Sequence, residues 1–273
     1  MHRKITLLFI GYLASSDKVT LMNPFKITWH WFERMSSPRH FYRTTGSWIP
    51  WLAAITLFLL LAGAIIGLFY ADEHPEQRQI YRILYVHVPA ASLSLMIYVA
   101  MAFAAAISLV WRLKMAEIIT LSLAPVGAAL TFLTLITGSL WGSETWNTWW
   151  AWDARMTSEL FLLFLYMGVM GLGNAIEDRR SAAQATAILI LSTVAIIPFI
   201  IISVNPELGF GTLHQSSTAK FDNSQMGPSV RRPYLFMVFG FIFFIAWAVI
   251  MRARTEILFR ERNTQWVKKE ISQ

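Results

Sequence analysis

The chain has 273 residues, of which 56% are hydrophobic and only 14% are charged. A soluble domain carries about 25% charged residues, so this composition excludes an ordinary soluble fold and places much of the chain in lipid. The net charge of +7 is typical of membrane proteins that keep basic loops on one side, and we favour this interpretation over nucleic-acid binding. The absence of cysteine excludes disulfides, thiolate metal ligands and covalent c-type heme attachment.

The first segment, 1–46, is basic and is predicted to be a cytoplasmic tail. Two interpretations of its beginning stay open. Either a signal peptide ends near Ser16, or translation starts later, at Met22 or Met35.

Six stretches without Asp, Glu, Lys or Arg follow this tail. A membrane-crossing helix needs about 20 apolar residues, so they predict an all-α polytopic membrane protein with six transmembrane helices in the domain 47–251. Pro125 and Pro198, inside the third and fifth stretches, predict kinks. The predicted spans are Thr44–Ala71, Ile83–Trp111, Ile118–Ser143, Leu160–Ile176, Ser181–Pro206 and Pro233–Met251.

The connections between the spans differ in charge. Seventeen Lys and Arg residues lie in the N-terminal tail, in the connections after the second and fourth spans, and in the basic tail 252–273, against six elsewhere. Because Lys and Arg are retained inside, both termini are predicted to be cytoplasmic, as expected for an inner-membrane protein. The outer loops are then 72–87, 141–157 and 204–232.

The loop 141–157 holds five Trp residues within twelve positions, more than the one or two rings per helix end of an interfacial belt. Trp146, Trp149 and Trp150 fall at i, i+3 and i+4, so a short helix is predicted to present them as a platform for a large planar ring. Asp153 is predicted to cap the fourth span. The candidate binding residues in this loop are Trp141, Trp146, Trp149, Trp150, Trp152, Asp153 and Arg155.

Histidines on the outer side provide candidate metal ligands. His87 lies two residues before Pro89, which is predicted to start the second span, and His214 lies in the last outer loop. Two imidazoles can take the fifth and sixth positions of an iron porphyrin. His74 is a rival ligand, but its three neighbouring carboxylates favour a protonated surface imidazole. The outer cations available to porphyrin propionates are Arg155, Arg231, Arg232, Arg78 and Arg82.

The segment WWAWDARMTSEL at 149–160 resembles the WWD signature of heme-handling membrane proteins. The segments YRILYVHVPAA at 81–91 and TLHQ at 212–215 narrow the resemblance to the CcmC family, the heme exporter proteins C of system I cytochrome c maturation. The similarity extends over 47–262 of the sequence. One departure precedes the second histidine, where the family usually has paired tryptophans and this chain has Leu-Gly-Phe-Gly at 208–211.

The resemblance implies a heme-delivery protein and not an enzyme. It implies heme b, held without a covalent bond at the outer, periplasmic face by His87 and His214 as axial iron ligands and by the tryptophan loop. The partners it implies are a periplasmic heme chaperone (CcmE), a small membrane helper subunit (CcmD) and two ABC transporter subunits (CcmA and CcmB).

Three other classes stay open. Heme lyases or synthases share the WWD signature but are much longer, with more spans. A proton-coupled transporter or membrane enzyme places ionisable groups in mid-membrane, whereas Glu117, Glu159 and His87 fall near predicted span ends. A non-heme copper or zinc site at His74, His87 and His214 would leave the tryptophans unexplained.

Overall fold

The computed structural model describes residues 36–205, 212–214 and 227–272. The alternatives for the chain start and the departure at 208–211 lie outside these ranges. Within them the structure is helical, which confirms the all-α prediction, and strand-like pairing is limited to one bridge between His74 and Arg78. The elements are α3 (Pro38–Gly46), α4 (Ile49–Phe69), the 3₁₀ helix η1 (Gln79–Ile83), α5 (Leu84–Trp111), α6 (Lys114–Thr145), α7 (Ala154–Ala175), α8 (Arg179–Thr193), α9 (Ile196–Ile202), α10 (Pro228–Arg260) and α11 (Gln265–Ile271).

Six helical segments of the described residues are long and apolar enough to cross a membrane, which confirms the predicted number. Their bounds differ from the predicted ones. α6 begins at Lys114 instead of Ile118, and α10 continues past Met251 to Arg260. A search that stops at charged residues misses these ends, because long charged side chains reach water from the interface while the helix continues. The segments are Ile49–Phe69, Gln79–Trp111, Lys114–Thr145, Ala154–Ala175, Arg179–Ile202 and Pro228–Arg260.

The fifth span is interrupted near the predicted kink. Residues 194 and 195 separate α8 from α9, and Pro198 is the third residue of α9. Proline has no N–H to donate to the carbonyl of Val194, four residues earlier. That carbonyl instead accepts the N–H of Ile197 at 3.0 Å, a bond of the 3₁₀ type. α6, by contrast, continues through Pro125.

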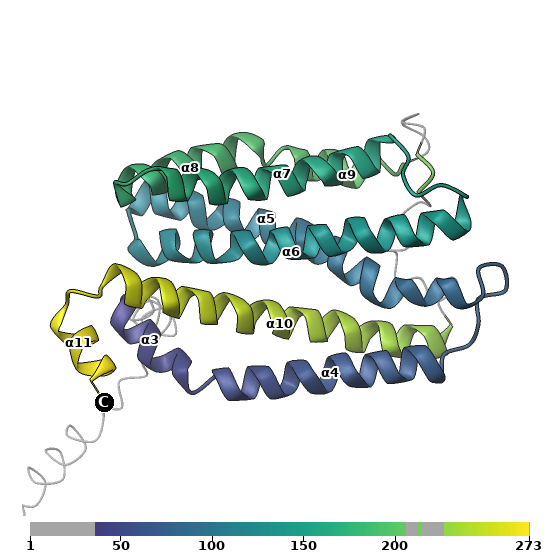
Figure 1. Cartoon of the computed structure of the whole chain (residues 1–273), viewed down its shortest axis with the longest axis horizontal. Helices are drawn as coiled ribbons and strands as arrows, with labels where there is room; N and C mark the ends of the chain where they lie inside the picture. Colours follow the sequence, from purple (N-terminus) through teal and green to yellow (C-terminus); the bar gives the residue numbers. More distant parts are fainter. Residues whose placement is uncertain (1–35, 206–211, 215–226, 273) are drawn as a thin grey trace, which may run out of the picture.

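The helices pack as a central bundle with an added pair. α5 and α6 lie along each other, α7 lies against α6, and α8 lies against α5 and α7. α10 contacts α5 and α6 and carries α4 on its other side (Figure 1). α6 and α7 approach closely at Gly127, where an added Cβ would come within 2.2 Å of the Tyr166 ring. The buried Tyr166 hydroxyl donates to the carbonyl of Ser94 at 2.7 Å and ties α7 to α5.

Both terminal helices lie at one end of the bundle, together with the α5–α6 and α7–α8 connections (Figure 1). A small core that contains Phe41, Met115 and Ile257 holds α3 against α6 and α10 at this end. The segments 70–78 and 146–153 lie at the opposite end. The basic connections therefore share one end, as the charge asymmetry predicts, and the cytoplasmic orientation of that end remains a prediction.

The orientation can be tested by labelling, since the chain has no natural cysteine. Ser143→Cys and Thr148→Cys lie at the end that holds the tryptophan loop, and Ser181→Cys lies at the end that holds the terminal helices. In intact cells an impermeant maleimide is expected to label the first two and not the third. Labelling of Ser181→Cys without cell lysis would reverse the orientation.

Candidate functional site

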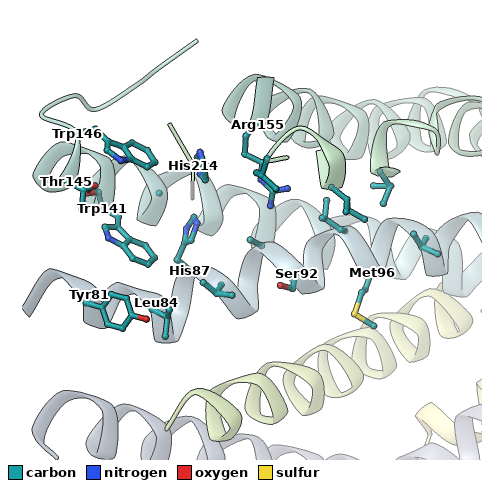
Figure 2. A pocket seen from close by; sticks show the side chains of 18 of the residues that line it. Tyr81, Leu84, His87, Ser92, Met96, Trp141, Thr145, Trp146, Arg155 and His214 are labelled. Carbon is teal, nitrogen blue, oxygen red and sulfur yellow. The ribbon is translucent and has the colours of Figure 1, made fainter. Parts of the chain in front are cut away.

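A cavity of about 630 Å³ lies at the end of the bundle opposite α3 and α11. Its volume falls within the range of about 300–1,000 Å³ found for small-molecule and cofactor sites. Side chains of α5, α6, α7 and α9 line it together with His214 (Figure 2). The polar and aromatic side chains at its outer part are Gln77, Tyr81, His87, Trp141, Thr145, Trp146, Arg155 and His214.

The inner part of the cavity is apolar and follows α5 along the side of the bundle. Met96 and Phe103 line the cavity and yet are 63% and 68% exposed on the bundle surface. Ile197 and Ile201 of α9 belong to the same lining. Because these residues belong to helices that are long and apolar enough to cross a membrane, we expect this side of the cavity to face lipid.

His87 lies deeper in its helix than the sequence predicts. α5 begins at Leu84, next to the predicted bound Ile83 of the second span, and η1 directly precedes it. The prediction that Pro89 marks the start of the helix is therefore wrong. Pro89 is tolerated because it removes a single backbone donor near the helix start. His87 therefore belongs to the first turn of α5 and lines the cavity.

Contacts across the α5–α6 interface fix the His87 ring. The Thr137 hydroxyl donates to the carbonyl of Leu133 at 2.7 Å, so its oxygen accepts the Nδ1–H of His87 at 3.0 Å. This bond selects the tautomer that leaves Nε2 with a free lone pair, as in metal-ligating histidines. The ring has room because Gly138 faces it, where an added Cβ would lie 3.0 Å from Cε1. Trp141 meets the ring edge-on at 5.7 Å between centroids.

His214 is held in place by Asp153. The Asp153 carboxylate accepts the backbone N–H of Met156 at 2.8 Å, which confirms the predicted cap of the fourth span. Its Oδ2 also accepts the Thr212 hydroxyl at 2.7 Å and the Leu213 N–H at 3.1 Å. Nδ1 of His214 lies 3.7 Å from the same Oδ2. One buried carboxylate thus joins the start of α7 to the segment 212–214.

The same contacts keep Asp153 ionised. Burial alone would raise the pKa of this carboxyl, but the nearby His214 imidazole and the bonds from Met156, Thr212 and Leu213 outweigh it. The pKa of Asp153 therefore lies well below its usual range. The 3.7 Å separation is longer than a hydrogen bond, and Nδ1 of His214 has no hydrogen-bond partner among the described residues. The position of the ring therefore depends on the bonds of Thr212 and Leu213 to Asp153 and on the packing of Trp146.

The tryptophan loop does not form the predicted helix. α6 ends at Thr145, and Asn147 has a left-handed backbone with φ of 55°, so Trp146, Trp149 and Trp150 do not share a helical face. Trp146 packs on His214 with 5.1 Å between ring centroids. Trp141 and Trp146 line the cavity.

The other three tryptophans of the loop lie outside the cavity lining. Trp149 and Trp152 are 63% and 78% exposed, and Trp150 meets Trp152 edge-on at 5.5 Å. In the sequence they lie between Trp146 and Asp153, which both contact the segment 212–214. Their predicted role in binding stays a prediction.

Among the described cavity-lining residues Arg155 is the one arginine, and its Nη1 donates to the carbonyl of Ile200 at 2.8 Å. The sequence analysis placed Glu159, one turn further along α7, near a span end but did not predict its burial. Glu159 is 3% exposed, its Oε1 accepts the Ser94 hydroxyl at 3.1 Å, and its Oε2 has no hydrogen-bond partner among the described residues. An acidic residue four positions after a cation at the start of a long apolar stretch was the available signal.

His74 lies behind the cavity wall. Its Nδ1 accepts the N–H groups of Glu76 and Gln77 at 3.3 and 3.2 Å, and its ring packs on Tyr81 at 4.4 Å between centroids. Gln77 in turn accepts the indole N–H of Trp141 at 2.9 Å. Within the part of the chain that the structure describes, no three His, Asp or Glu side chains group closely enough to hold a metal ion.

The fold and the site together define a polytopic helical membrane protein with a cofactor-sized cavity, lined by two imidazoles and two indoles at one end of its bundle. The chain belongs to the CcmC family: the family model described as heme exporter protein C matches residues 31–268.

Relatives in this family resemble the chain over most of its length. It is 44% identical to heme exporter protein C of Escherichia coli (strain K12) over 243 residues, which cover 89% of this chain and 97% of that protein. It is 40% identical to heme exporter protein C of Haemophilus influenzae, with 88% and 97% covered. The protein of the same name from Bradyrhizobium diazoefficiens is 38% identical, with 83% and 85% covered.

Proposed function

We propose that this chain binds heme b without a covalent bond in the outer cavity and delivers it for the maturation of c-type cytochromes. The observation that carries the proposal is that His87 and His214 line one cavity, where Nδ1 of His87 bonds to Thr137 and Nδ1 of His214 lies 3.7 Å from Asp153. The bond to Thr137 leaves Nε2 of His87 for axial ligation of an iron, and the His214 imidazole can supply the second axial nitrogen. Membership of the heme exporter protein C family supports heme as the cargo.

The remaining lining suits a porphyrin. Trp141 and Trp146 offer aromatic surfaces beside the two imidazoles, and the apolar stretch along α5 suits the hydrophobic macrocycle. Arg155 can pair with a propionate. The cavity is lined by residues that can bind heme, and this suits a protein that transports heme. We therefore place this chain among delivery proteins and not among enzymes.

Delivery requires a partner at the same face. We propose that heme passes to a periplasmic chaperone of the CcmE type, with CcmD, CcmA and CcmB as further components of the inner-membrane module. The exposed rings of Trp149 and Trp152 support such a transfer face, because aromatic side chains are enriched at the buried centres of protein interfaces.

Heme titration of the purified chain tests this function. We expect a Soret band typical of a six-coordinate bis-imidazole heme, and complete extraction of the porphyrin by acidified organic solvent, because the chain has no cysteine. Heme that stays on the polypeptide through denaturing electrophoresis, or the absence of any Soret shift, contradicts the proposal.

A pair of double variants separates heme capture from membrane anchoring. Trp141→Ala with Trp146→Ala removes the two rings that line the cavity and is expected to weaken heme binding about five- to 160-fold, since each stacked ring contributes about 0.5–1.5 kcal/mol. Trp48→Ala with Trp51→Ala is the matched control, because these exposed rings lie at the other end of the bundle. If both double variants lose heme equally, the tryptophan loop acts as a membrane anchor and not in heme capture.

A further inference from the structure

A second cavity, of about 710 Å³, lies at the end of the bundle that carries α3 and α11. It is formed by the ends of α5, α6, α8 and α10, and the heme proposal uses none of its residues. Three acidic side chains line it: Glu117, Glu177 and Glu261. Six cationic side chains line it: Arg112, Lys114, Arg179, Arg180, Arg260 and Arg262. The excess of cations makes this cavity a candidate for an anionic ligand.

Two of the carboxylates are already engaged by protein groups. Glu117 pairs with Arg260 at 3.2 Å, and Glu261 accepts the indole N–H of Trp266 at 2.6 Å. Arg260 is also paired with Glu256 at 2.6 Å, which leaves its Nη2 buried and without a hydrogen-bond partner among the described residues. A buried guanidinium N–H without an acceptor costs free energy, so this atom is a ready donor to an anionic oxygen in the cavity.

Other cations are held around the opening. The guanidinium groups of Arg179 and Arg262 lie 5.2 and 5.0 Å from the centre of the Phe259 ring, within cation–π distance. One exposed aromatic ring thus positions two arginines from different elements. Among the residues that the structure describes, neither guanidinium group donates a hydrogen bond to a protein oxygen. Both groups can therefore donate hydrogen bonds to a ligand.

Arg112 occupies a position that favours glycine. It ends α5 with φ of 54° and ψ of 37°, the left-handed conformation that Gly adopts at no steric cost. An arginine here is less stable than glycine as a helix end, and its exposed side chain lines the cavity. This residue therefore contributes a positive charge to the cavity, although its backbone conformation would be more stable with glycine.

We propose that this cavity binds the phosphate of an anionic phospholipid. It lies at the ends of four membrane-spanning helices, at the level where lipid headgroups meet the protein. Leu109 and Ile118 give it an apolar floor, and the exposed Val110 and Trp111 beside it form a lipid-facing surface for acyl chains. Basic pockets between transmembrane helices on the cytoplasmic side bind lipid headgroups of this charge.

A free phosphate would contact the same cations but not the apolar surface. The test therefore measures binding of phospholipids and of free phosphate separately. Native mass spectrometry of the full chain in neutral detergent measures bound phosphatidylglycerol and cardiolipin, with phosphatidylcholine as the zwitterionic reference. The chain is expected to retain the anionic lipids at least tenfold better than phosphatidylcholine. Glycerol phosphate or inorganic phosphate at millimolar concentration is expected not to displace them.

The variant Arg112→Gly with Arg180→Gln removes two cavity charges, and its glycine suits the left-handed backbone, so the protein is expected to fold. Anionic lipid binding should weaken roughly 30-fold, from about fivefold per basic residue beside an anionic headgroup. The matched control is Arg252→Gln with Lys268→Gln, which removes the same charge from exposed positions outside the cavity lining.

Three outcomes overturn the proposal. The first is equal retention of phosphatidylcholine and the anionic lipids. The second is full displacement by free phosphate, which assigns the cavity to a soluble anion. The third is an equal loss in the control variant, which reduces the effect to overall charge. Heme binding is measured on the same samples and is expected to stay unchanged, so the result is independent of the function proposed above.

Discussion

Replacing either His87 or His214 by glycine is expected to remove most of the bound heme. Each imidazole supplies one of two axial ligands, and loss of a ligand exceeds the roughly 10–100-fold loss seen when groups that only support metal ligands are mutated. Affinity should therefore fall at least about 100-fold in each variant. Absorption titration measures the loss and shows whether the residual heme is five-coordinate.

Added imidazole is expected to restore the six-coordinate spectrum in both variants, because glycine leaves a ring-sized space beside the iron. His74→Ala is the control, since its Nδ1 accepts two backbone N–H groups and the residue lies outside the cavity lining. Loss of heme in His74→Ala together with an unchanged spectrum in His214→Gly would move the second ligand to His74.

The pH dependence has a defined sign. The neutral imidazole ligates iron, so heme occupancy is expected to fall on acidification, as protons compete with the metal for the ligand nitrogens. Asp153 stays ionised until far into the acid range, because its pKa lies well below its usual range. The stability that it contributes is complete above its unfolded pKa of about 3.9 and is lost only as the pH falls through its lower folded value. Heme occupancy by absorption and unfolding by circular dichroism, measured over the same pH series, check both signs.

The second large effect is expected at Asp153. Asp153→Ala removes both the α7 cap and the acceptor of the Thr212 hydroxyl and Leu213 N–H, so His214 loses its support. Heme affinity should fall about 10–100-fold, as for other groups that support a metal ligand. The loss of a cap alone costs about 1 kcal/mol of stability.

Asp178→Ala separates these two contributions. Asp178 caps α8 by accepting the N–H of Ser181 at 2.8 Å, at the other end of the bundle. Asp178→Ala is expected to lose the stability of a cap, and Asp153→Ala somewhat more, because it also leaves the Thr212 hydroxyl and the Leu213 N–H without their acceptor. Only Asp153→Ala should lose heme. If Asp178→Ala reduces heme binding as much as Asp153→Ala, capping alone explains the effect, and the proposed support of His214 is wrong.

Local chemistry made part of this structure predictable. Long apolar stretches gave six spans, and the position of Asp153 before a helical stretch gave the cap. The remainder depends on contacts between residues distant in sequence. Thr137, which selects the His87 tautomer, lies 50 residues from it, and Thr212 lies 59 residues from Asp153. No periodicity along the chain encodes such pairs.

The tryptophan loop illustrates a different limit. Its i, i+3, i+4 spacing is helical, but the positive φ of Asn147 directs the chain out of α6 after Thr145. Asparagine tolerates this conformation better than most residues, and a single such residue cancels the pattern around it. The burial of Glu159 could not be predicted from the charge pattern, because a charged residue near the end of a span normally lies at the membrane interface.

The exposed wall of Met96 and Phe103 means that the protein alone does not complete the outer cavity. The lipid or detergent around the purified chain completes the wall of the cavity, with acyl chains in a nanodisc and with alkyl tails in a micelle. Apparent heme affinities measured in different detergents are therefore not interchangeable. Variants at this site can be ranked only when all are measured in the same bilayer.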